Sequence, residues 1–190
     1  MTEPVGVVHG RFQPLHLGHL EYLLAAQGAC DVLLVGITNP DPWQTTFEAT
    51  DPARGEPVAN PCTYYERLLM VEGALVECGV ARSRFRVVPF PHSYPERLGH
   101  YVPAGALMLM TIYDEWGESK LERFHRVGLR THVLWRREEK ITTGSAIREA
   151  IVDRRPWEDL VPAATARVIR EHGVEERIRR MARERGAGDR

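Results

Sequence analysis

The stretch that decides the fold reads Gly10-Arg11-Phe12-Gln13-Pro14-Leu15-His16-Leu17-Gly18-His19. It follows a short apolar run at residues 5–8 and opens an amphipathic run at 17–29, so the order is strand, glycine-containing turn, helix. Such a junction aims backbone N–H groups and the positive end of a helix dipole at an anion, usually a phosphate. The turn also carries three side chains that donate to phosphate oxygens: Arg11, His16 and His19.

The two histidines of this turn are candidate catalytic residues. His16 and His19 are three residues apart at the expected start of a helix, which places both imidazoles on one face. Metal binding is the competing interpretation, but it needs a third ligand with a hydrogen-bonded partner of its own, and none stands out. His9, at the end of the first apolar run, either lines the same pocket or has a structural role.

Apolar runs typical of buried strands alternate with helical patterns along the chain. The strand-like runs cover residues 5–9, 32–37, 85–89, 106–111 and 131–135. The helical patterns between them cover residues 17–27, 64–78 and 118–127. This alternation predicts an α/β fold of the Rossmann-like, doubly wound type, in which helices cover both faces of a parallel five-stranded sheet. Ligand is then expected beyond the carboxyl ends of the strands.

We expect one α/β domain over residues 1–155, with a C-terminal helical extension over 156–190 packed on it. In the tail, Ser145 is the expected cap of one helix, a second helix starts near Trp157, and a charge-rich third helix follows. Residues 39–61 form a long, proline-rich connection that is either a lid over the site or a disordered insertion.

Charge and composition exclude several classes of protein. The net charge of −1 at pH 7 argues against a nucleic-acid surface, and no uncharged apolar run is long enough to span a membrane. The first residues lack the pattern of a secretory signal and the three cysteines lack C-x-x-C spacing, so we expect a cytoplasmic protein with reduced thiols. Cys30 and Cys78 are expected in the core. The charged tail either packs on a second copy, giving a homo-oligomer, or is solvated.

A second candidate phosphate element lies far along the chain, in Ile141-Thr142-Thr143-Gly144-Ser145-Ala146-Ile147-Arg148. It follows the fifth apolar run and opens a helix, whose N-terminus offers free N–H groups. Thr143 and Ser145 offer hydroxyls, and Arg148, one turn into the helix, can reach back to the same anion. Taken alone, the element is also compatible with an ordinary helix cap. Paired with the first turn, it predicts the second half of a triphosphate clamp.

Together the two elements resemble the two signatures of the H-x-G-H nucleotidylyltransferase superfamily. The first reads G-R-F-Q-P-x-H-x-G-H, and residues 143–148 are similar to the second, I-S-G-T-E-I-R. Residues 60–67 are similar to N-P-F-T-x-x-E-R, and residues 157–162 to W-x-x-L-V-P. The similarity runs from about residue 5 to 180 and indicates the branch of archaeal nicotinamide mononucleotide (NMN) adenylyltransferases. H-x-G-H alone is shared with class I aminoacyl-tRNA synthetases, but no K-M-S-K-S-like element follows it here.

The resemblance implies a role for each matched residue. The catalytic residues it implies are His16, His19 and Arg148, which bind the phosphates and stabilise charge in the transition state. The nucleotide-binding residues it implies are Gly10, Arg11, Phe12, Thr143, Ser145 and Arg148. Mg2+ is carried by the nucleoside triphosphate, and no metal site in the protein is expected. An acceptor phosphate or phosphonate oxygen attacks the α-phosphorus and pyrophosphate leaves; since this acceptor is ionised at pH 7, no general base is needed.

The chain departs from that branch around the acceptor. The segment after the third strand has no tryptophan to stack on nicotinamide, and Phe90 or Tyr94 is the aromatic side chain available there. Only Arg54 lies near the N-P-x-T element, and residues 111–117 replace the usual S-x-N-P segment. Trp116 either faces the pocket or packs its helix on the core. The predicted acceptor or base pocket is therefore Tyr94, Tyr113, Asp114, Trp116 and Arg54.

These departures favour a small anionic acceptor. The resemblance extends to cytidylyltransferases of phosphonate-antibiotic pathways, and we expect CTP-dependent cytidylyl transfer to a small phosphonate. ATP-dependent adenylyl transfer to NMN is the alternative, and a non-catalytic nucleotide-binding regulator is a third interpretation. The expected partners are a nucleoside triphosphate, either CTP or ATP, and a small phosphorylated or phosphonate acceptor, without nucleic acid or membrane.

Overall fold

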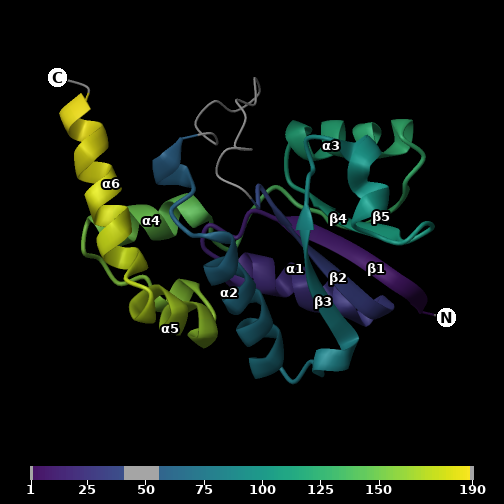
Figure 1. Cartoon of the computed structure of the whole chain (residues 1–190), viewed down its shortest axis with the longest axis horizontal. Coiled ribbons are helices and arrows are strands. Elements are labelled where there is room, and N and C mark those ends of the chain that lie inside the picture. The colour runs from purple at the N-terminus through teal and green to yellow at the C-terminus, as the bar shows by residue number, and fades with distance from the viewer. Residues whose placement is uncertain (1, 41–55, 189–190) are drawn as a thin grey trace.

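The computed structural model of the chain describes residues 2–40 and 56–188. Within them, five parallel strands form one sheet in the order β3-β2-β1-β4-β5 (Figure 1). The strands are β1 (Glu3–Gly10), β2 (Cys30–Thr38), β3 (Phe85–Phe90), β4 (Leu107–Ile112) and β5 (Arg130–Arg136). β1 pairs with both β2 and β4, so the strand order reverses beside β1. Doubly wound sheets bind ligands at this reversal, and the topology confirms the predicted fold class.

Helices cover both faces of the sheet, with α1 and α2 on one face and α3 on the other (Figure 1). The first four are α1 (Leu17–Gly28), α2 (Tyr64–Glu77), α3 (Glu115–Arg126) and α4 (Gly144–Val152). Two more helices, α5 (Ala163–Glu171) and α6 (Val174–Gly188), lie beyond α2 and α4 (Figure 1). Across the described part of the chain, none of the helices is long and apolar enough to cross a membrane.

The alternation of side chains along each strand explains why both faces are covered. On β1, Val8 belongs to the core cluster packed against α1 and α2, whereas Val7 belongs to the cluster packed against α3. On β4, Leu109 joins the first cluster and Met108 joins the second. Phe124 of α3 closes the second cluster and is almost fully buried. The strands are apolar on both sides, as a buried parallel sheet requires.

The start of α4 differs from the sequence prediction. Thr143, not Ser145, caps this helix, because the Thr143 hydroxyl oxygen accepts from the Ala146 backbone N–H at 3.1 Å. Ser145 is already inside the first turn of the helix. Ser145 is not the cap because α4 begins one residue earlier, at Gly144, which lies directly against the first motif turn. The capping position therefore falls on Thr143.

The start of the tail helices also differs from the prediction. Trp157 does not begin a helix; it precedes a short 3-10 turn, and α5 begins at Ala163. Proline disfavours the helical conformation in the residue before it, and Val161, which precedes Pro162, is extended with φ −129 and ψ 156. A helix running from Trp157 through Pro162 is therefore blocked at Val161.

The cysteines are free thiols, but they differ in burial. Cys30 is buried, as predicted. Cys78 is exposed, which corrects the expectation that it lies in the core. It is the C-cap residue of α2, beyond Glu77, the last residue of the helix, so it is not part of the buried face of that helix.

Candidate active site

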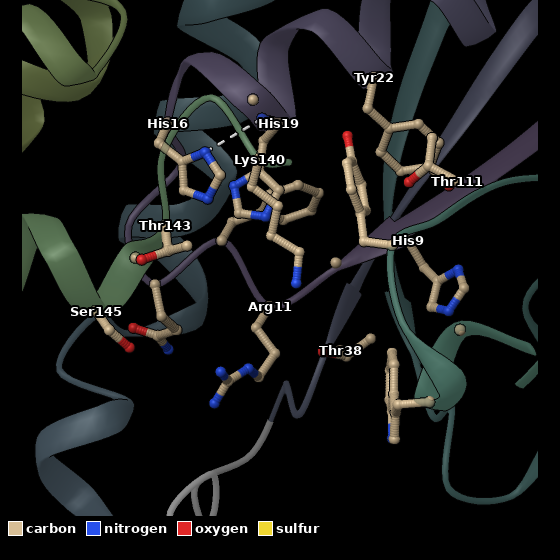
Figure 2. A pocket seen from close by; sticks show the side chains of 18 of the residues that line it. His9, Arg11, His16, His19, Tyr22, Thr38, Thr111, Lys140, Thr143 and Ser145 are labelled. Carbon is tan, nitrogen blue, oxygen red and sulfur yellow. Dashed lines mark hydrogen bonds between the residues drawn. The ribbon is translucent and has the colours of Figure 1, made fainter. Parts of the chain in front are cut away.

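A cavity of about 410 Å³ opens at the carboxyl edge of the sheet (Figure 2). Gly10 ends β1, Thr38 ends β2 and Thr111 lies near the end of β4, and all three line the cavity. Its volume is in the range of small-molecule sites. Because it faces the point where the strand order reverses, it lies where a doubly wound sheet places its ligand.

The two motif turns meet in this cavity although 135 residues separate Gln13 from Arg148. Arg148 Nη1 donates to the Gln13 carbonyl oxygen at 2.6 Å. A Cβ atom on Gly144 would lie 2.8 Å from the same oxygen, so glycine is what allows α4 to start this close to the first turn. Figure 2 shows Ser145 on the same side of the cavity as His16. The structure thus brings the two predicted phosphate elements into one cleft.

His16 is both the cap of α1 and a candidate phosphate ligand. Its Nδ1 accepts a hydrogen bond from the His19 backbone N–H at 3.3 Å, so in the neutral ring the proton is on Nε2. Nε2 is then the atom that can donate to a phosphate oxygen. The two imidazoles stack with their centroids 3.7 Å apart, and Phe12 packs edge-on against His19 at 4.9 Å. This packing holds both rings on one face of the helix.

Burial sets the charge of both imidazoles. It lowers the pKa of His16 to about 4, and the charge of Lys140 acts in the same direction. Burial also holds the pKa of His19 well below its ordinary value, with smaller contributions from His16 and Arg11. Both rings are therefore neutral at pH 7 in the free protein. They can approach a phosphate as hydrogen-bond donors and do not act as fixed positive charges.

The start of α4 forms the other side of the clamp. Arg148 Nη2 donates to the Ser145 hydroxyl oxygen at 3.1 Å. Burial lowers the pKa of Arg148 from its ordinary value, but a guanidinium stays protonated at pH 7. The Thr143 oxygen is occupied by its cap, which leaves the hydroxyl hydrogen to donate into the cleft. This side therefore offers a guanidinium, two hydroxyls and a helix N-terminus to one anion.

The first turn is anchored by an aromatic ring. Phe12 adopts the left-handed conformation, with φ 52, and its side chain is fully buried. This backbone conformation costs a non-glycine residue on the order of 1–3 kcal/mol, which burial of the ring offsets. A Cβ atom on Gly10 would lie 2.9 Å from the same ring, so glycine is needed there too. With Phe12 fixed in the core, the Arg11 side chain extends into the cavity (Figure 2).

Arg67 of α2 holds the loops that carry this turn. Its guanidinium donates to the carbonyl oxygens of Arg11 at 3.0 Å, Thr38 at 2.7 Å and Asn39 at 2.8 Å. Burial lowers the pKa of Arg67 to about 10, so the side chain remains cationic at pH 7. One residue thus ties the loop after β1 to the end of β2. This gives a structural reason for the arginine of the N-P-C-T-Y-Y-E-R segment.

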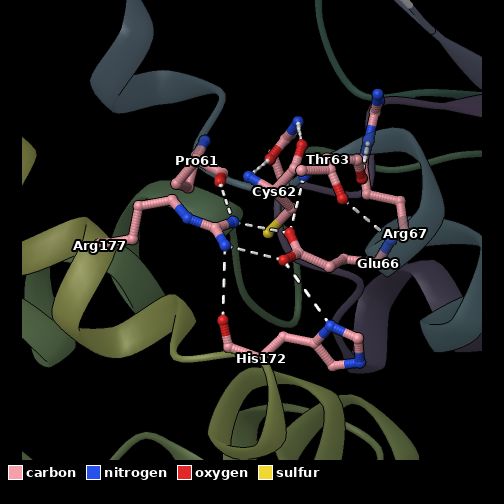
Figure 3. Close-up of polar contacts among 8 residues, drawn as sticks. Pro61, Cys62, Thr63, Glu66, Arg67, His172 and Arg177 are labelled. Atoms are coloured by element: carbon pink, nitrogen blue, oxygen red, sulfur yellow. Dashed lines mark hydrogen bonds and ion pairs between the residues drawn. The ribbon is translucent and has the colours of Figure 1, made fainter.

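Glu66, the neighbour of Arg67 in the chain, joins α2 to α6 (Figure 3). Its carboxylate accepts from Arg177 at 2.7 and 2.9 Å and from the Thr63 backbone N–H at 2.8 Å. Burial acts to raise the pKa of this carboxyl, but the hydrogen bonds from Arg177 and Thr63 outweigh burial and lower it. Arg177 also donates to the Pro61 carbonyl oxygen at 2.9 Å. The last helix therefore supports the segment that leads into α2.

Three of the predicted acceptor residues line the cavity: Tyr113, Asp114 and Trp116. Asp114 caps α3 through the Gly117 backbone N–H at 3.0 Å and forms an ion pair with Lys140 at 3.3 Å. The Tyr113 hydroxyl accepts from the indole N–H of Trp135 at 3.0 Å. Asp114 and Tyr113 thus already have protein partners and a structural role. Any contact that they make with a substrate is in addition to that role.

Of the other two predicted acceptor residues, the structure describes only Tyr94. Tyr94 is absent from the cavity lining within the described residues; it is 43% exposed, and Arg97 lies over its ring at 5.2 Å. This corrects the expectation that Tyr94 lines the acceptor pocket. Phe90, the other aromatic side chain of that segment, is fully buried. Arg54 lies outside the described residues, as do residues 41–55 of the predicted lid.

The sequence analysis missed part of the cavity lining. His9, which it left open, lines the cavity, and so do Thr38, His92, Lys120 and Lys140. A signal for the lysines was available, because the chain has lysine only at positions 120 and 140. Thr38 and His92 carried no such signal, because a single polar residue at the end of a strand fits many surface positions.

The cavity offers few protein ligands for a metal ion. Among the described residues, no group of three or more histidine, cysteine, aspartate or glutamate side chains is placed to hold one. Asp114, a carboxylate in the described lining, already pairs with Lys140. The residues present therefore suit a divalent cation that is coordinated mostly by phosphate oxygens, as Mg2+ commonly is.

A cleft that joins two predicted phosphate elements at the switch point of a doubly wound sheet is typical of enzymes that handle nucleotides. The chain belongs to the cytidylyltransferase-like family, whose sequence profile matches residues 7–150. It is 64% identical to phosphonoformate cytidylyltransferase of Streptomyces viridochromogenes over 174 residues, which cover 92% of this chain and 95% of that protein. Nicotinamide-nucleotide adenylyltransferases of Thermococcus kodakarensis and Pyrococcus furiosus are 28% and 29% identical, each over 93% of this chain and 88% of the relative. These matches confirm the resemblance drawn from the motifs.

Solved structures agree with this fold. A bifunctional NMN adenylyltransferase/ADP ribose pyrophosphatase from Francisella tularensis superposes with a TM-score of 0.66 at 13% sequence identity. The superposition covers 94% of this chain and 53% of that protein, so this chain spans about half its length. Another structure of the Francisella protein contains AMP and a manganese ion. At this identity the likeness concerns the fold alone, and it confirms the Rossmann-like architecture.

Proposed function

We propose that this protein transfers CMP from CTP to a small phosphonate, phosphonoformate, with release of pyrophosphate. The observation that carries the proposal is the 64% identity with phosphonoformate cytidylyltransferase over 92% of the chain. The cavity supports it, because both predicted phosphate elements line it together with residues outside these elements, in a volume of about 410 Å³ that suits small ligands. The adenylyltransferases, which are 28% and 29% identical, are more distant relatives.

In this proposal an ionised phosphonate oxygen attacks the α-phosphorus of CTP, and the bond from that phosphorus to the bridging oxygen of the β-phosphate breaks. Pyrophosphate then leaves in line. The second turn holds the β- and γ-phosphates through Thr143, Ser145 and Arg148. Arg11 and the backbone of the first turn hold the α-phosphate and the phosphonate. His16 and His19 donate from neutral rings to oxygens that gain charge in the transition state.

Mg2+ enters this proposal with the triphosphate. When bound, it neutralises part of the charge on the phosphate oxygens and orients them. The residues of the two turns would hold the phosphate oxygens that carry the ion. Asp114 lines the cavity and has a carboxylate of the type that binds Mg2+, but this carboxylate already forms an ion pair with Lys140.

The test is a matrix of substrates with the purified protein and Mg2+. Each of the four nucleoside triphosphates is combined with phosphonoformate, methylphosphonate, NMN or nicotinate mononucleotide. Products are identified by mass and pyrophosphate release is measured. We expect CTP and phosphonoformate to give CMP-phosphonoformate. Turnover of ATP with NMN and not of CTP with phosphonoformate would overturn the proposal, and no pyrophosphate release with any pair would favour a non-catalytic nucleotide-binding protein.

A further inference from the structure

The end of the cavity away from the clamp contains buried polar atoms that the protein leaves unpaired. His9 is 7% exposed, and neither of its ring nitrogens has a hydrogen-bond partner among the described residues. Thr38 is 3% exposed, and its hydroxyl oxygen likewise lacks a partner within that part of the chain. Both line the cavity, and Figure 2 shows them on the opposite side of Arg11 from Ser145. A buried polar group without a partner loses its hydrogen bonds to water and destabilises the fold, so these atoms indicate a ligand.

Aromatic packing fixes the position of His9. Its ring stacks on Phe90 with the centroids 4.7 Å apart and lies tilted against Phe124 at 5.4 Å. Gly36 makes room for this arrangement, because a Cβ atom there would lie 2.6 Å from Phe90. The imidazole is therefore held by ring packing alone. Both of its nitrogens are left to bind a molecule in the cavity. If packing were the only role of this position, an apolar side chain would fill it without burying two unpaired nitrogens.

A cationic side chain, that of Lys120, lies at the same end. Lys120 of α3 lines the cavity and lies over the ring of Trp116 at 4.8 Å. His92, which is 9% exposed, also lines it. Burial keeps the pKa of His9 well below its ordinary value, and the charges of Lys120 and then His92 lower it further. Lys120 is thus near enough to affect His9, and this end of the cavity favours an anion over a cation.

We propose that His9, Thr38 and Lys120 form a subsite for a carboxylate of the acceptor, and that this subsite selects phosphonates with a carboxylate next to the phosphorus. The inference rests on the proposed function. In phosphonoformate the carboxylate carbon is bonded directly to phosphorus, so adjacent surfaces of the cavity must bind the two anionic groups. The phosphonate faces the α-phosphorus of the nucleotide, and the carboxylate accepts hydrogen bonds from the Thr38 hydroxyl, the Lys120 ammonium and one N–H of His9. An acceptor without the carboxylate leaves the Thr38 hydroxyl and the His9 ring nitrogens without a ligand partner and is disfavoured.

The first test compares two acceptors in two variants. Thr38→Val removes a hydroxyl and keeps the shape, and Lys120→Met removes the charge. Each variant is expected to lower kcat/KM for phosphonoformate by roughly 10- to 100-fold, to leave kcat/KM for methylphosphonate within about threefold, and to keep the KM for CTP. Thr165→Val is the matched control, because Thr165 of α5 is also buried with an unpaired hydroxyl among the described residues but does not line the cavity. An unchanged preference between the two acceptors in both variants would overturn the subsite.

Thermal unfolding separates a binding role from a structural one. Replacing an unpaired buried polar group with an apolar group of similar size is neutral or stabilising. We therefore expect His9→Leu and Thr38→Val to keep or raise the Tm while the preference for phosphonoformate falls. A lower Tm together with an unchanged acceptor preference would show that these residues serve the fold and would overturn the proposal.

Binding without turnover distinguishes this inference from the proposed function. Reductive methylation with 13C-formaldehyde labels both lysines and keeps their charge, and Lys120→Arg identifies the NMR signal of Lys120. Saturating pyrophosphate fills the clamp, and phosphonoformate is then expected to shift the signal of Lys120 but not that of Lys140. A shift of Lys120 without any product from CTP supports the subsite and contradicts the proposed function. Product formation with an unshifted Lys120 supports the proposed function and overturns the subsite.

Discussion

The two nitrogens of His16 have separate roles. Nδ1 accepts from the His19 backbone and caps α1, which leaves Nε2 with its hydrogen for a phosphate oxygen. The spacing of H-x-G-H was enough to predict that the two rings share a helix face. It did not predict that the first ring caps the helix or that burial keeps both rings neutral. The cap and the neutral charge depend on the residues that pack around the motif in the fold. They cannot be predicted from the motif sequence itself.

Removing the second imidazole of the motif should affect the rate more than the fold. For His19→Ala we expect kcat to fall by about 10²–10³, which corresponds to roughly 2.7–4 kcal/mol, because one positioned donor to the transition state is lost. The measurement is pyrophosphate release at saturating CTP and acceptor. His100→Ala, at an exposed position, is the control and should keep normal turnover. Near-normal turnover of His19→Ala would contradict the role assigned to this ring.

The contact at Gly144 predicts a defect in nucleotide binding. In Gly144→Ala the new Cβ atom would lie 2.8 Å from the Gln13 carbonyl oxygen and 3.1 Å from Arg148 Nη1, so the two turns must separate. We expect the KM for CTP to rise by roughly tenfold and the free energy of unfolding to fall by about 1–3 kcal/mol. Gly28→Ala, where a Cβ atom would meet nothing within 4 Å among the described residues, should change neither. An unchanged KM in Gly144→Ala would show that the close approach of the turns is unnecessary.

At the scale of elements, strands were easier to predict than helix ends. The five strands appear as near-continuous apolar runs because both of their faces are buried, and the structure confirms each of them. Helix starts depend on neighbours as well as on local residues. α4 starts at Gly144 because it packs on the first turn, and α5 starts after Pro162 because Val161 cannot be helical. The C-terminal end of α2, where Cys78 is exposed, is a further boundary that local hydrophobicity did not reveal.

Arg67 connects the loop after β1 to the end of β2, and a lysine cannot replace it. Arg67→Lys keeps the charge but loses the planar group that donates to three carbonyl oxygens at once. We expect the free energy of unfolding in urea to fall by roughly 2–4 kcal/mol, because buried carbonyl oxygens lose their donors. kcat/KM for CTP should fall as well, since the Arg11 loop is released.

Arg82→Lys is the control for this substitution. Arg82 makes a single ion pair with Glu72, and its side chain is 66% exposed. Exposed pairs contribute little, so the change in unfolding free energy should stay within about 0.5 kcal/mol. Equal stability changes in Arg67→Lys and Arg82→Lys would contradict the assigned role of Arg67.

At the scale of the whole molecule, the two ends of the cavity differed in how well the sequence predicted them. Each turn of the clamp is one continuous motif, so its residues could be named before the fold was known. The other end combines His9 of β1, Thr38 of β2, the loop after β3 and Lys120 of α3. Those residues come together only through the strand order β3-β2-β1-β4-β5, and apart from the rarity of lysine in the chain no local pattern distinguishes them.

The buried imidazoles make stability depend on pH. Burial lowers the pKa of His9, His16 and His19 below the ordinary value of 6.5, and for His16 to about 4, so below 6.5 the unfolded chain binds protons that the folded protein does not bind. Their contribution is complete above about pH 7 and is lost progressively as the pH falls below 6.5, down to about pH 4 for His16. Urea unfolding between pH 8 and 5 measures it. The lowered pKa of Glu66 acts in a different window, because its contribution is lost only below its ordinary value of 4.5.

His16→Asn is the control for this pH dependence. Asparagine keeps an acceptor for the cap of α1 but does not titrate in this range. The variant should therefore show a smaller loss of stability between pH 8 and 5 than the unmodified protein. A flat profile for the unmodified protein would mean that the three rings are not held neutral by burial.

The hydrogen bond between Arg148 and Gln13 also has a consequence for protein synthesis. The ribosome makes the first turn early, but its partner follows only after 135 more residues have been added. At about 5–20 residues per second this delay is roughly 7 to 27 seconds. During that time a nascent chain holds only one of the two turns, so in the proposed function it has no second turn with which to bind a triphosphate.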